Sequence, residues 1–254
     1  RGGHVAPVFA LSLSGAGTIY YTLDGTDPRL PEKAGRTTGA QTLVPASAAK
    51  RVLVPLRDIG DTWKGAGSFD DSAWTRVAGA PGGVGYERGT GYASLLSLDV
   101  GGQMYGTGKA TSCYLRIPFT LAAVGPFQTM ILNVRYDDGF IAYLNGTEIH
   151  RVLFGGTPRW NSVATANHEA DSVESFVVSD HIGLLRTGQN LLAIHGLNVS
   201  ATSSDFLVLA SLEAAAATSG QSSGIAPTAI RYPGPVPLTR SVRVKARALS
   251  GTTW

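Results

Sequence analysis

The sequence predicts an all-β fold, and three observations carry that prediction. Glycine (32 residues) and proline (13) are abundant, while charged residues make up only 15% of the 254, a composition that favours short strands and tight turns. Runs of alternating apolar and polar residues recur along the chain. The clearest run, Arg135–Arg151, contains Asn145-Gly146, a dipeptide that supplies the two positive-φ positions of a type I′ hairpin turn. Together these features indicate a β-sandwich.

The stretch Met130–Arg151 is expected to form three short antiparallel strands. Met130–Tyr136 alternates as a strand does and is followed by Asp137-Asp138-Gly139, which has the composition of a turn. Adjacent residues on a strand point to opposite faces, so Asp137 and Asp138 cannot flank one scissile bond as a catalytic pair. We therefore interpret this pair, like Asp70/Asp71, as turn residues.

Further alternating or apolar runs predict the remaining strands of the same domain. They are Cys113–Leu121, Ser172–Val178, Asn190–Asn198 and Asp205–Glu213. Cys113 is expected to be a buried small apolar residue. His195 lies in a segment that is apolar on both faces, so we expect a core histidine bonded to a polar neighbour such as Asn198 or Asp205.

Two motifs in this part of the chain resemble a known family. Phe69–Trp74 (FDDSAW) and Arg135–Gly146 (RYDDGFIAYLNG) are similar to the galactose-binding-like jelly roll that accompanies β-galactosidase-type glycosidases. The resemblance implies a sugar-binding accessory domain with a jelly-roll fold. In the first motif, the Asp-Asp-Ser segment should cap a short turn whose Trp74 packs inward.

The two ends of the chain carry a second resemblance. Val5–Leu23 reads as two strands separated by Ser14–Gly17, a hairpin signal. Residues 20–29, YYTLDGTDPR, resemble the small immunoglobulin-like domain at the C-terminus of chitobiases and β-hexosaminidases. The continuation expected for that domain appears only at Tyr232–Leu238 and Val242–Leu249. The motif order therefore predicts one domain built from both ends.

This order defines the expected domain boundaries. Residues 1–31 plus 228–254 should form the small immunoglobulin-like sandwich, and the jelly roll should occupy 51–213 as an insertion. Residues 32–50 and 214–227 should be linkers, the second with an alanine run that could form one helical turn. The alternative, two incomplete copies of the small domain, would leave each copy with too few strands for a core.

Sugar binding requires a partly exposed aromatic face surrounded by polar side chains. The polar segment Phe154–Asp171 is expected to be a loop and carries a tryptophan, and Tyr86–Tyr92 is a second candidate segment at the same end of the sandwich. The candidate sugar-binding residues are Trp160, Arg159, Asn161, His168, Glu169, Tyr86 and Tyr92. An alternative interpretation has Trp160 capping the open end of the sandwich without contacting a ligand.

The jelly-roll resemblance also implies a structural calcium ion near the place where the first and last strands meet. Calcium binds six to eight hard oxygen ligands. The carboxylates in that part of the chain are Asp58, Asp61, Asp70, Asp71 and Glu213.

These observations favour a non-catalytic carbohydrate-binding module that recognises a polysaccharide or oligosaccharide. The sequence contains no His-Glu-x-x-His motif and no phosphate loop, so we expect no enzymatic activity, and a hydrolase with a cryptic site is the least favoured alternative. The other alternative is a structural spacer or adhesion segment without a ligand. The net charge of +3 is not gathered into a stripe, and no apolar run has the length of a membrane span; neither nucleic acid nor a membrane is an expected partner.

The combination of the two domains resembles segments of large exported bacterial proteins. It implies that the chain is a fragment of such a protein, secreted or held at the cell surface, with the other domains of the same parent chain as partners.

Overall fold

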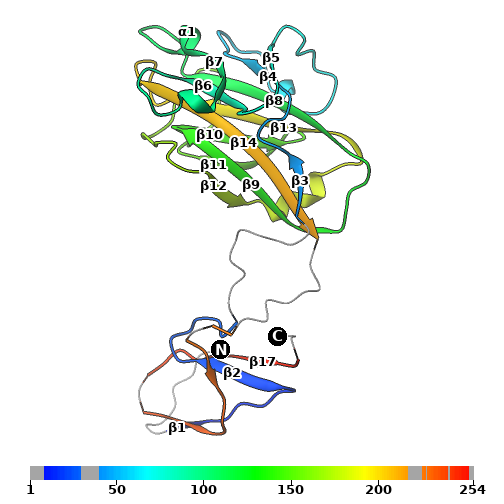
Figure 1. Ribbon diagram of the computed structural model, residues 1–254, viewed down its shortest axis with the longest axis vertical. Helices are drawn as coiled ribbons and strands as arrows, with labels where there is room; N and C mark the ends of the chain where they lie inside the picture. The colour runs from blue at the N-terminus through cyan, green and yellow to red at the C-terminus, as the bar shows by residue number, and fades with distance from the viewer. Residues whose placement is uncertain (1–8, 30–39, 217–224, 227, 240, 252–254) are drawn as a thin grey trace. The chain divides into compact units, whose positions relative to one another are not determined.

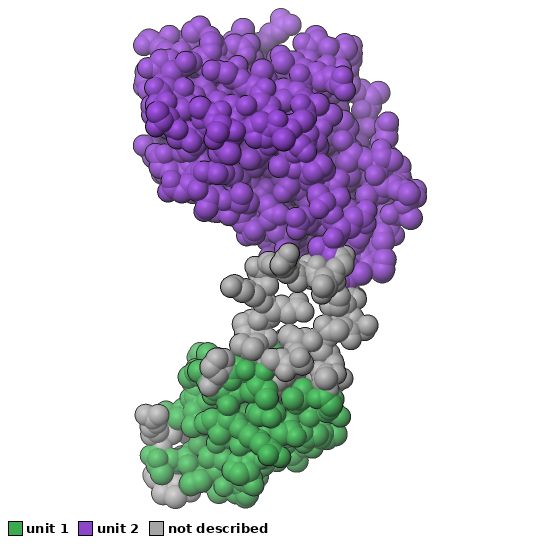
Figure 2. Space-filling model, viewed as in Figure 1, with its two compact units in different colours: residues 1–38, 218–254 green, residues 39–217 purple. Residues whose placement is uncertain are grey.

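The chain folds into two compact units in the computed structural model (Figure 2). One is Gly39–Ala217, and the other combines Arg1–Thr38 with Thr218–Trp254. The structure describes residues 9–29, 40–216, 225–226, 228–239 and 241–251. The first part of the first predicted linker (32–39) and the middle of the second (217–224) lie outside these described residues.

The smaller unit pairs strands from opposite ends of the chain. Its strands are β1 (Phe9–Leu11), β2 (Thr18–Thr22), β15 (Ile230–Arg231), β16 (Val236–Leu238) and β17 (Lys245–Leu249). One sheet is β1-β16 and the other is β15-β2-β17. The predicted hairpin between β1 and β2 is wrong, because each strand pairs with partners from the C-terminal end instead. The Asp27 carboxylate also joins the two ends, since it accepts hydrogen bonds of 2.8 to 2.9 Å from the Arg247 guanidinium.

The larger unit is a sandwich of two sheets (Figure 1). Its strands are β3 (Ala40–Val44), β4 (Lys50–Leu53), β5 (Thr75–Val77), β6 (Gly83–Glu87), β7 (Leu96–Asp99), β8 (Ser112–Leu121), β9 (Phe127–Asp137), β10 (Gly139–Leu144), β11 (Thr147–Val152), β12 (Glu174–Val177), β13 (Gly188–Leu197) and β14 (Asp205–Ala216). The β8 sheet has the order β11-β10-β13-β8-β4-β5. The β9 sheet has the order β12-β9-β14-β6-β7, with β3 beside β14. The all-β sandwich predicted from the sequence is confirmed.

Helical structure in the described residues is limited to short segments in the connections. They are η1 (Thr62–Lys64), η2 (Ala93–Leu95), α1 (Gly101–Met104) and η3 (Ser179–Leu184). No helix in the described part of the chain has the length and apolar character needed to cross a membrane.

The β8 sheet buries both of its faces. Cys113, Leu115 and Ile194 face the β9 sheet and belong to the main core between the sheets. The residues between them in sequence point the other way, so Tyr114 and its neighbours form a second apolar cluster on the outer face. The long connections after β4 and β11 cover this outer face, since Trp63 and Trp74 come from the first and Trp160 from the second. The outer face is therefore covered by loops rather than by the second sheet.

The predicted turn at Asn145-Gly146 is confirmed. Both residues have positive φ, 52° and 94°, as a type I′ turn requires, and β10 pairs with β11 across it. The preceding strand behaves differently from the prediction. β9 pairs with β12 and β14, whereas β10 lies in the other sheet, so Asp137–Gly139 is a crossing between sheets rather than a hairpin turn.

The sandwich begins earlier and ends later than the sequence suggested. Residues 40–44, expected in a linker, form β3, which pairs with β14, and the segment Ala214–Ala216 continues β14 as a strand rather than a helical turn. Alanine has the higher helix propensity, but β14 lies between β9 and β3, and the backbone hydrogen bonds to both neighbours override that local preference.

Candidate functional site

An arginine on the outer face of the β8 sheet anchors the connection that follows β4. The Arg116 Nε donates a hydrogen bond of 2.7 Å to Asp71, and its Nη1 donates to the carbonyl oxygens of Trp63 and Gly65. The guanidinium also lies 4.9 Å from the centre of the Phe69 ring. Because Arg116 is nearly fully buried, these contacts hold the connection firmly against the strand.

Aromatic stacking fixes the same connection. The Trp63 ring stacks on Tyr114 of β8 with ring centroids 4.0 Å apart, and Trp74 lies against both rings. Trp74 is buried, as the motif predicted, and the Asp70 carboxylate accepts the backbone N–H of Ser72 at 2.9 Å, which is the predicted cap. The connection after β4 is therefore fixed against the sheet, and it forms the first wall of a pocket.

The second wall comes from the loop after β11, and a pocket lies between the two walls. We call it the Trp160 pocket; its volume is about 260 Å³. It is lined by Asp58, Gly60, Asp61, Lys64, Tyr114, Thr157, Pro158, Arg159, Trp160 and His195. Tyr114 and His195 come from β8 and β13, so the sheet itself forms the floor.

The side chain of His195 is buried but is not satisfied as predicted. Its exposed fraction is 1%, and its Nε2 has no hydrogen-bond partner among the described residues. Asn198, which we expected to bond to it, donates instead to the Tyr86 hydroxyl and to the Asp205 carbonyl. Burial, with a smaller contribution from the nearby Lys64 charge, lowers the pKa of His195 to about 3. The imidazole on the pocket floor is therefore neutral near pH 7.

This shift predicts how the stability of the larger unit depends on pH. The pKa of His195 is lower in the folded chain than in the unfolded chain (about 6.5), so below pH 6.5 the unfolded state takes up a proton that the folded state does not. Stability is lost as pH falls from 6.5 toward 3. Chemical denaturation should show that the native protein loses about 2 kcal/mol more unfolding free energy than His195→Gln does when the pH is lowered from ~7.5 to ~5. Parallel pH curves for the two proteins would contradict this prediction.

The structure places only part of the predicted sugar-binding set at the pocket. Trp160 is partly buried against the outer cluster and lines the pocket together with Arg159, in a loop that forms no helix or strand, as predicted. Asn161 is the next residue and is exposed. His168 lies elsewhere, stacked on Tyr136 and bonded to Glu174 at 2.7 Å.

The two predicted tyrosines are core residues. Tyr86 has an exposed fraction of 0% and Tyr92 of 5%, so neither can present an aromatic face to a sugar. The prediction that they bind a sugar directly is therefore wrong. Gly83–Glu87 is strand β6, which pairs with β14 and turns Tyr86 inward, and the Tyr92 hydroxyl is held by Asp137 and Glu169.

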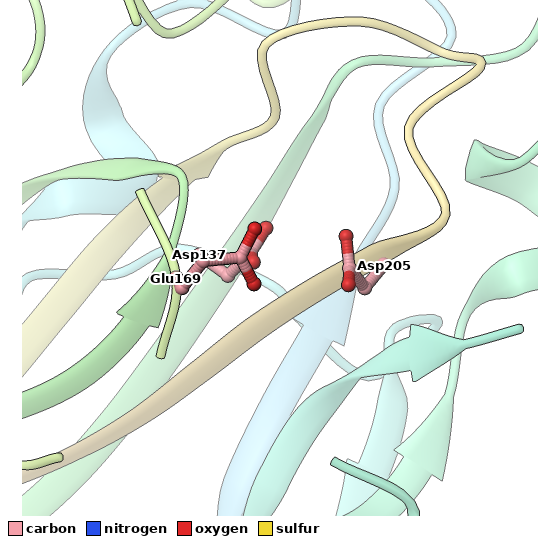
Figure 3. Close-up of side chains that lie close together, drawn as sticks. All are labelled: Asp137, Glu169 and Asp205. Carbon is pink, nitrogen blue, oxygen red and sulfur yellow. The ribbon is translucent and has the colours of Figure 1, made fainter. Parts of the chain in front are cut away.

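Three carboxylates meet at the end of the β9 sheet (Figure 3). Asp137 ends β9, Asp205 begins β14, and Glu169 comes from the loop after β11. One oxygen of each lies within 4.8 Å of the others. We call this group the acidic centre. The two segments predicted to gather at one end of the sandwich do meet here, because the Tyr92 hydroxyl lies 2.9 Å from Glu169 and 3.0 Å from Asp137.

The negative charge of the acidic centre is poorly compensated. The hydroxyl of Tyr92 has one proton for two carboxylate oxygens, and it accepts the N–H of Ala170 at 2.8 Å. Asp137 is 1% exposed and its Oδ1 has no partner, while no ion pair from the described lysines and arginines reaches Asp137, Glu169 or Asp205. Burial, followed by the charges of Asp138 and Asp205, raises the pKa of Asp137 to about 8.

The acidic centre could hold a metal ion. Carboxylate oxygens are the ligands of hard cations, and two ligands of one calcium ion lie at most about 5 Å apart, twice the Ca–O distance. The separations of the three carboxylate oxygens, at most 4.8 Å, fit that span. The buried Oδ1 of Asp137 has no hydrogen-bond partner among the described residues, and a bound cation would satisfy it. The residues present therefore fit such an ion.

None of the carboxylates predicted to bind calcium belongs to this centre. Asp70 caps a turn, and Asp71 pairs with Arg116 and, at 3.9 Å, with Arg51. Asp58 and Asp61 line the Trp160 pocket, where Asp61 pairs with Lys64. The remaining candidate, Glu213, lies in the middle of the β9 sheet, within β14. The prediction of a calcium site at these five carboxylates is therefore wrong for Asp70 and Asp71, which are engaged in other contacts, and the described carboxylates that do gather come from other parts of the sequence.

The fold and these two sites define a β-sandwich domain that carries a loop-walled pocket and an acidic centre. No protein-family model and no curated protein matches the sequence. The chain has a distant, partial structural similarity to segments of family 2 glycosidases.

Three solved structures illustrate this similarity. A calcium-binding mutant of Bacteroides uniformis β-glucuronidase 2 is 14% identical over 67% of this chain and 18% of its own, with a TM-score of 0.38. Bifidobacterium dentium β-glucuronidase is 15% identical over 65% of this chain and 21% of its own, with a TM-score of 0.39. A β-glucuronidase of an uncultured Clostridium sp. is 12% identical over 72% and 30%, with a TM-score of 0.40. The chain thus spans less than a third of each protein.

Proposed function

We propose that the larger unit is a non-catalytic carbohydrate-binding module and that the Trp160 pocket is its binding site. The observation that carries the proposal is the combination in one pocket of a partly buried tryptophan with carboxylate, guanidinium and ammonium groups. The apolar face of a pyranose packs on an aromatic ring, and its hydroxyls need such donors and acceptors.

The roles of the other carboxylates support binding without catalysis. Asp70 and Asp71 stabilise the wall of the pocket, and Asp138 accepts the backbone N–H groups of His168 and Val199 at 2.9 and 2.7 Å. Each of these acids is engaged in holding a loop. We propose on the same grounds that the chain has no glycosidase activity of its own, and that it serves a larger secreted or surface protein.

Affinity electrophoresis against soluble plant, algal and fungal polysaccharides tests the proposal. We expect one class of glycan to retard the native chain. Trp160→Ala should weaken that binding at least about tenfold, since an aromatic face contributes on the order of 1.5 kcal/mol or more. Tyr105→Ala is the matched control, because Tyr105 is 42% exposed but does not line the pocket. It should leave the retardation unchanged.

Two outcomes would contradict the proposal. If no glycan retards the folded chain, a spacer or adhesion segment without a ligand becomes the better interpretation. If a glycan binds and Tyr105→Ala weakens it while Trp160→Ala does not, the chain binds sugar at another surface.

We further propose that the acidic centre holds a structural calcium ion. Asp137, Glu169 and Asp205 would hold it, and the ion would tie the loop after β11 to the ends of β9 and β14. The positive charge of the ion would compensate the negative charges of the three carboxylates. The loop that carries Glu169 also carries Trp160, so the ion would help to order the segment that forms one wall of the pocket.

A further inference from the structure

We infer that the Trp160 pocket binds a single uncharged sugar residue at the end of a glycan chain rather than an internal stretch of it. This inference rests on the proposed function and specifies its ligand. The pocket is bounded on two sides by loops and below by the sheet, and its small volume fits one ring better than several.

The size of the pocket is the first argument. Its volume of about 260 Å³ lies below the range of about 300–1,000 Å³ that drug-sized ligands of several rings occupy. The walls are also held in place. Arg116 and the Trp63–Tyr114 stack fix one of them to the sheet, so widening the pocket would break buried contacts.

The floor supplies the second argument. His195 lines the pocket, and its buried Nε2 has no partner in the described residues. An unsatisfied buried polar atom is costly, and a ligand hydroxyl that reached the floor would satisfy it. A residue at a chain end that entered the pocket end-on would place a hydroxyl against this floor.

The charges on the rim supply the third argument. Lys64 and Asp61 form an ion pair with each other, which leaves Asp58 and Arg159 as one acceptor and one donor of opposite charge. The Asp58 carboxylate accepts only the backbone N–H of Gly60 at 2.8 Å, and no side-chain partner of the Arg159 guanidinium occurs among the described residues. This pair can bind neighbouring hydroxyls of a neutral sugar. The carboxylate of an acidic sugar would meet Asp58 as well as Arg159, so the repulsion from the first would offset its attraction to the second.

Methyl glycosides provide the direct test, because each presents one sugar ring and no chain. We would titrate the full chain with methyl glycosides of the common neutral pyranoses and with the matching uronic acids, and follow tryptophan fluorescence and isothermal heats. The binding free energy usual for ligands of this size predicts a dissociation constant on the order of 1 mM for one neutral glycoside. The uronic acid of the same configuration should bind at least about tenfold more weakly.

Variants locate the binding. Asp58→Asn should weaken binding of the neutral glycoside by about tenfold, because it removes a charged acceptor at the surface without touching the core. His195→Gln tests the floor independently and should also weaken binding. Asp180→Asn, an exposed carboxylate in η3 outside the pocket, is the control that should bind normally.

A length series then separates this inference from the proposed function. If the pocket binds chain ends, mono- to pentasaccharides of the retarding glycan will bind with similar affinity. Partial hydrolysis of the polysaccharide creates new chain ends, and the number of binding sites per unit mass will rise in proportion to them. If a polysaccharide binds in a Trp160-dependent way but no methyl glycoside does, and affinity rises with length, the chain-end inference is wrong and the proposed function stands. If neither glycosides nor polysaccharides bind, both fall together.

Discussion

Replacing Arg116 with methionine is expected to lower the unfolding free energy of the larger unit by about 3 kcal/mol, a loss typical of removing one partner of a buried charge network. Arg116 donates to Asp71 and to the carbonyl oxygens of Trp63 and Gly65. Methionine fills much of the same volume, so the loss reflects broken hydrogen bonds rather than a cavity. The corresponding fall in melting temperature is about 6–12 °C for a unit of this size. Differential scanning calorimetry measures both quantities.

The same substitution should loosen the pocket wall more than it loosens the core. We expect limited proteolysis of Arg116→Met to cut first within residues 56–74, before the rest of the sandwich unfolds. Arg76→Met is the matched control, because Arg76 lies exposed in β5, beside the same wall, and should change the melting temperature little. If Arg116→Met unfolds in one step with no early cleavage in this segment, the wall does not depend on Arg116.

The elements that were predicted correctly are those fixed by local chemistry. Asn145-Gly146 adopts the positive-φ pair that these two residues tolerate best, and strand β13 is apolar on both faces because it lies inside a sheet covered on both sides. The pairing of β9 could not be predicted in the same way. Asp137–Gly139 has the composition of a turn, but composition does not reveal whether the chain returns to the same sheet or crosses to the other one.

The candidate sites show the same limit. Trp160 and Arg159 were found because a tryptophan in a polar loop is unusual, and both line the pocket. The acidic centre was missed because its members are separated by 32 and 36 residues in sequence and meet only through the fold. The buried position of Asp137 had no signal in the sequence, since an aspartate before Asp-Gly reads as an exposed turn.

Calcium is expected to stabilise the larger unit through the acidic centre, and this effect should exceed that of any single surface contact. At a calcium concentration one hundred times the dissociation constant, binding adds about 2.7 kcal/mol to the unfolding free energy. That gain corresponds to a rise in melting temperature of about 5–10 °C relative to the protein in EDTA. Magnesium should give a smaller rise, because it demands shorter and more regular coordination.

Single substitutions at the acidic centre should change the calcium-dependent rise in melting temperature, whereas substitutions at other sites should not. Asp137→Asn should abolish the calcium-dependent rise and at the same time raise the melting temperature in EDTA, because the amide replaces, at nearly constant volume, a buried carboxyl group whose ionisation is opposed by burial and by its neighbours. Asp205→Asn should also abolish the rise. Asp58→Asn, which changes a carboxylate on the pocket rim, should keep the full calcium response while weakening sugar binding. If calcium up to about 10 mM, above the ~1 mM affinities of weak extracellular sites, leaves the native melting temperature unchanged and elemental analysis finds no metal, the acidic centre instead keeps a proton on Asp137 as its compensation.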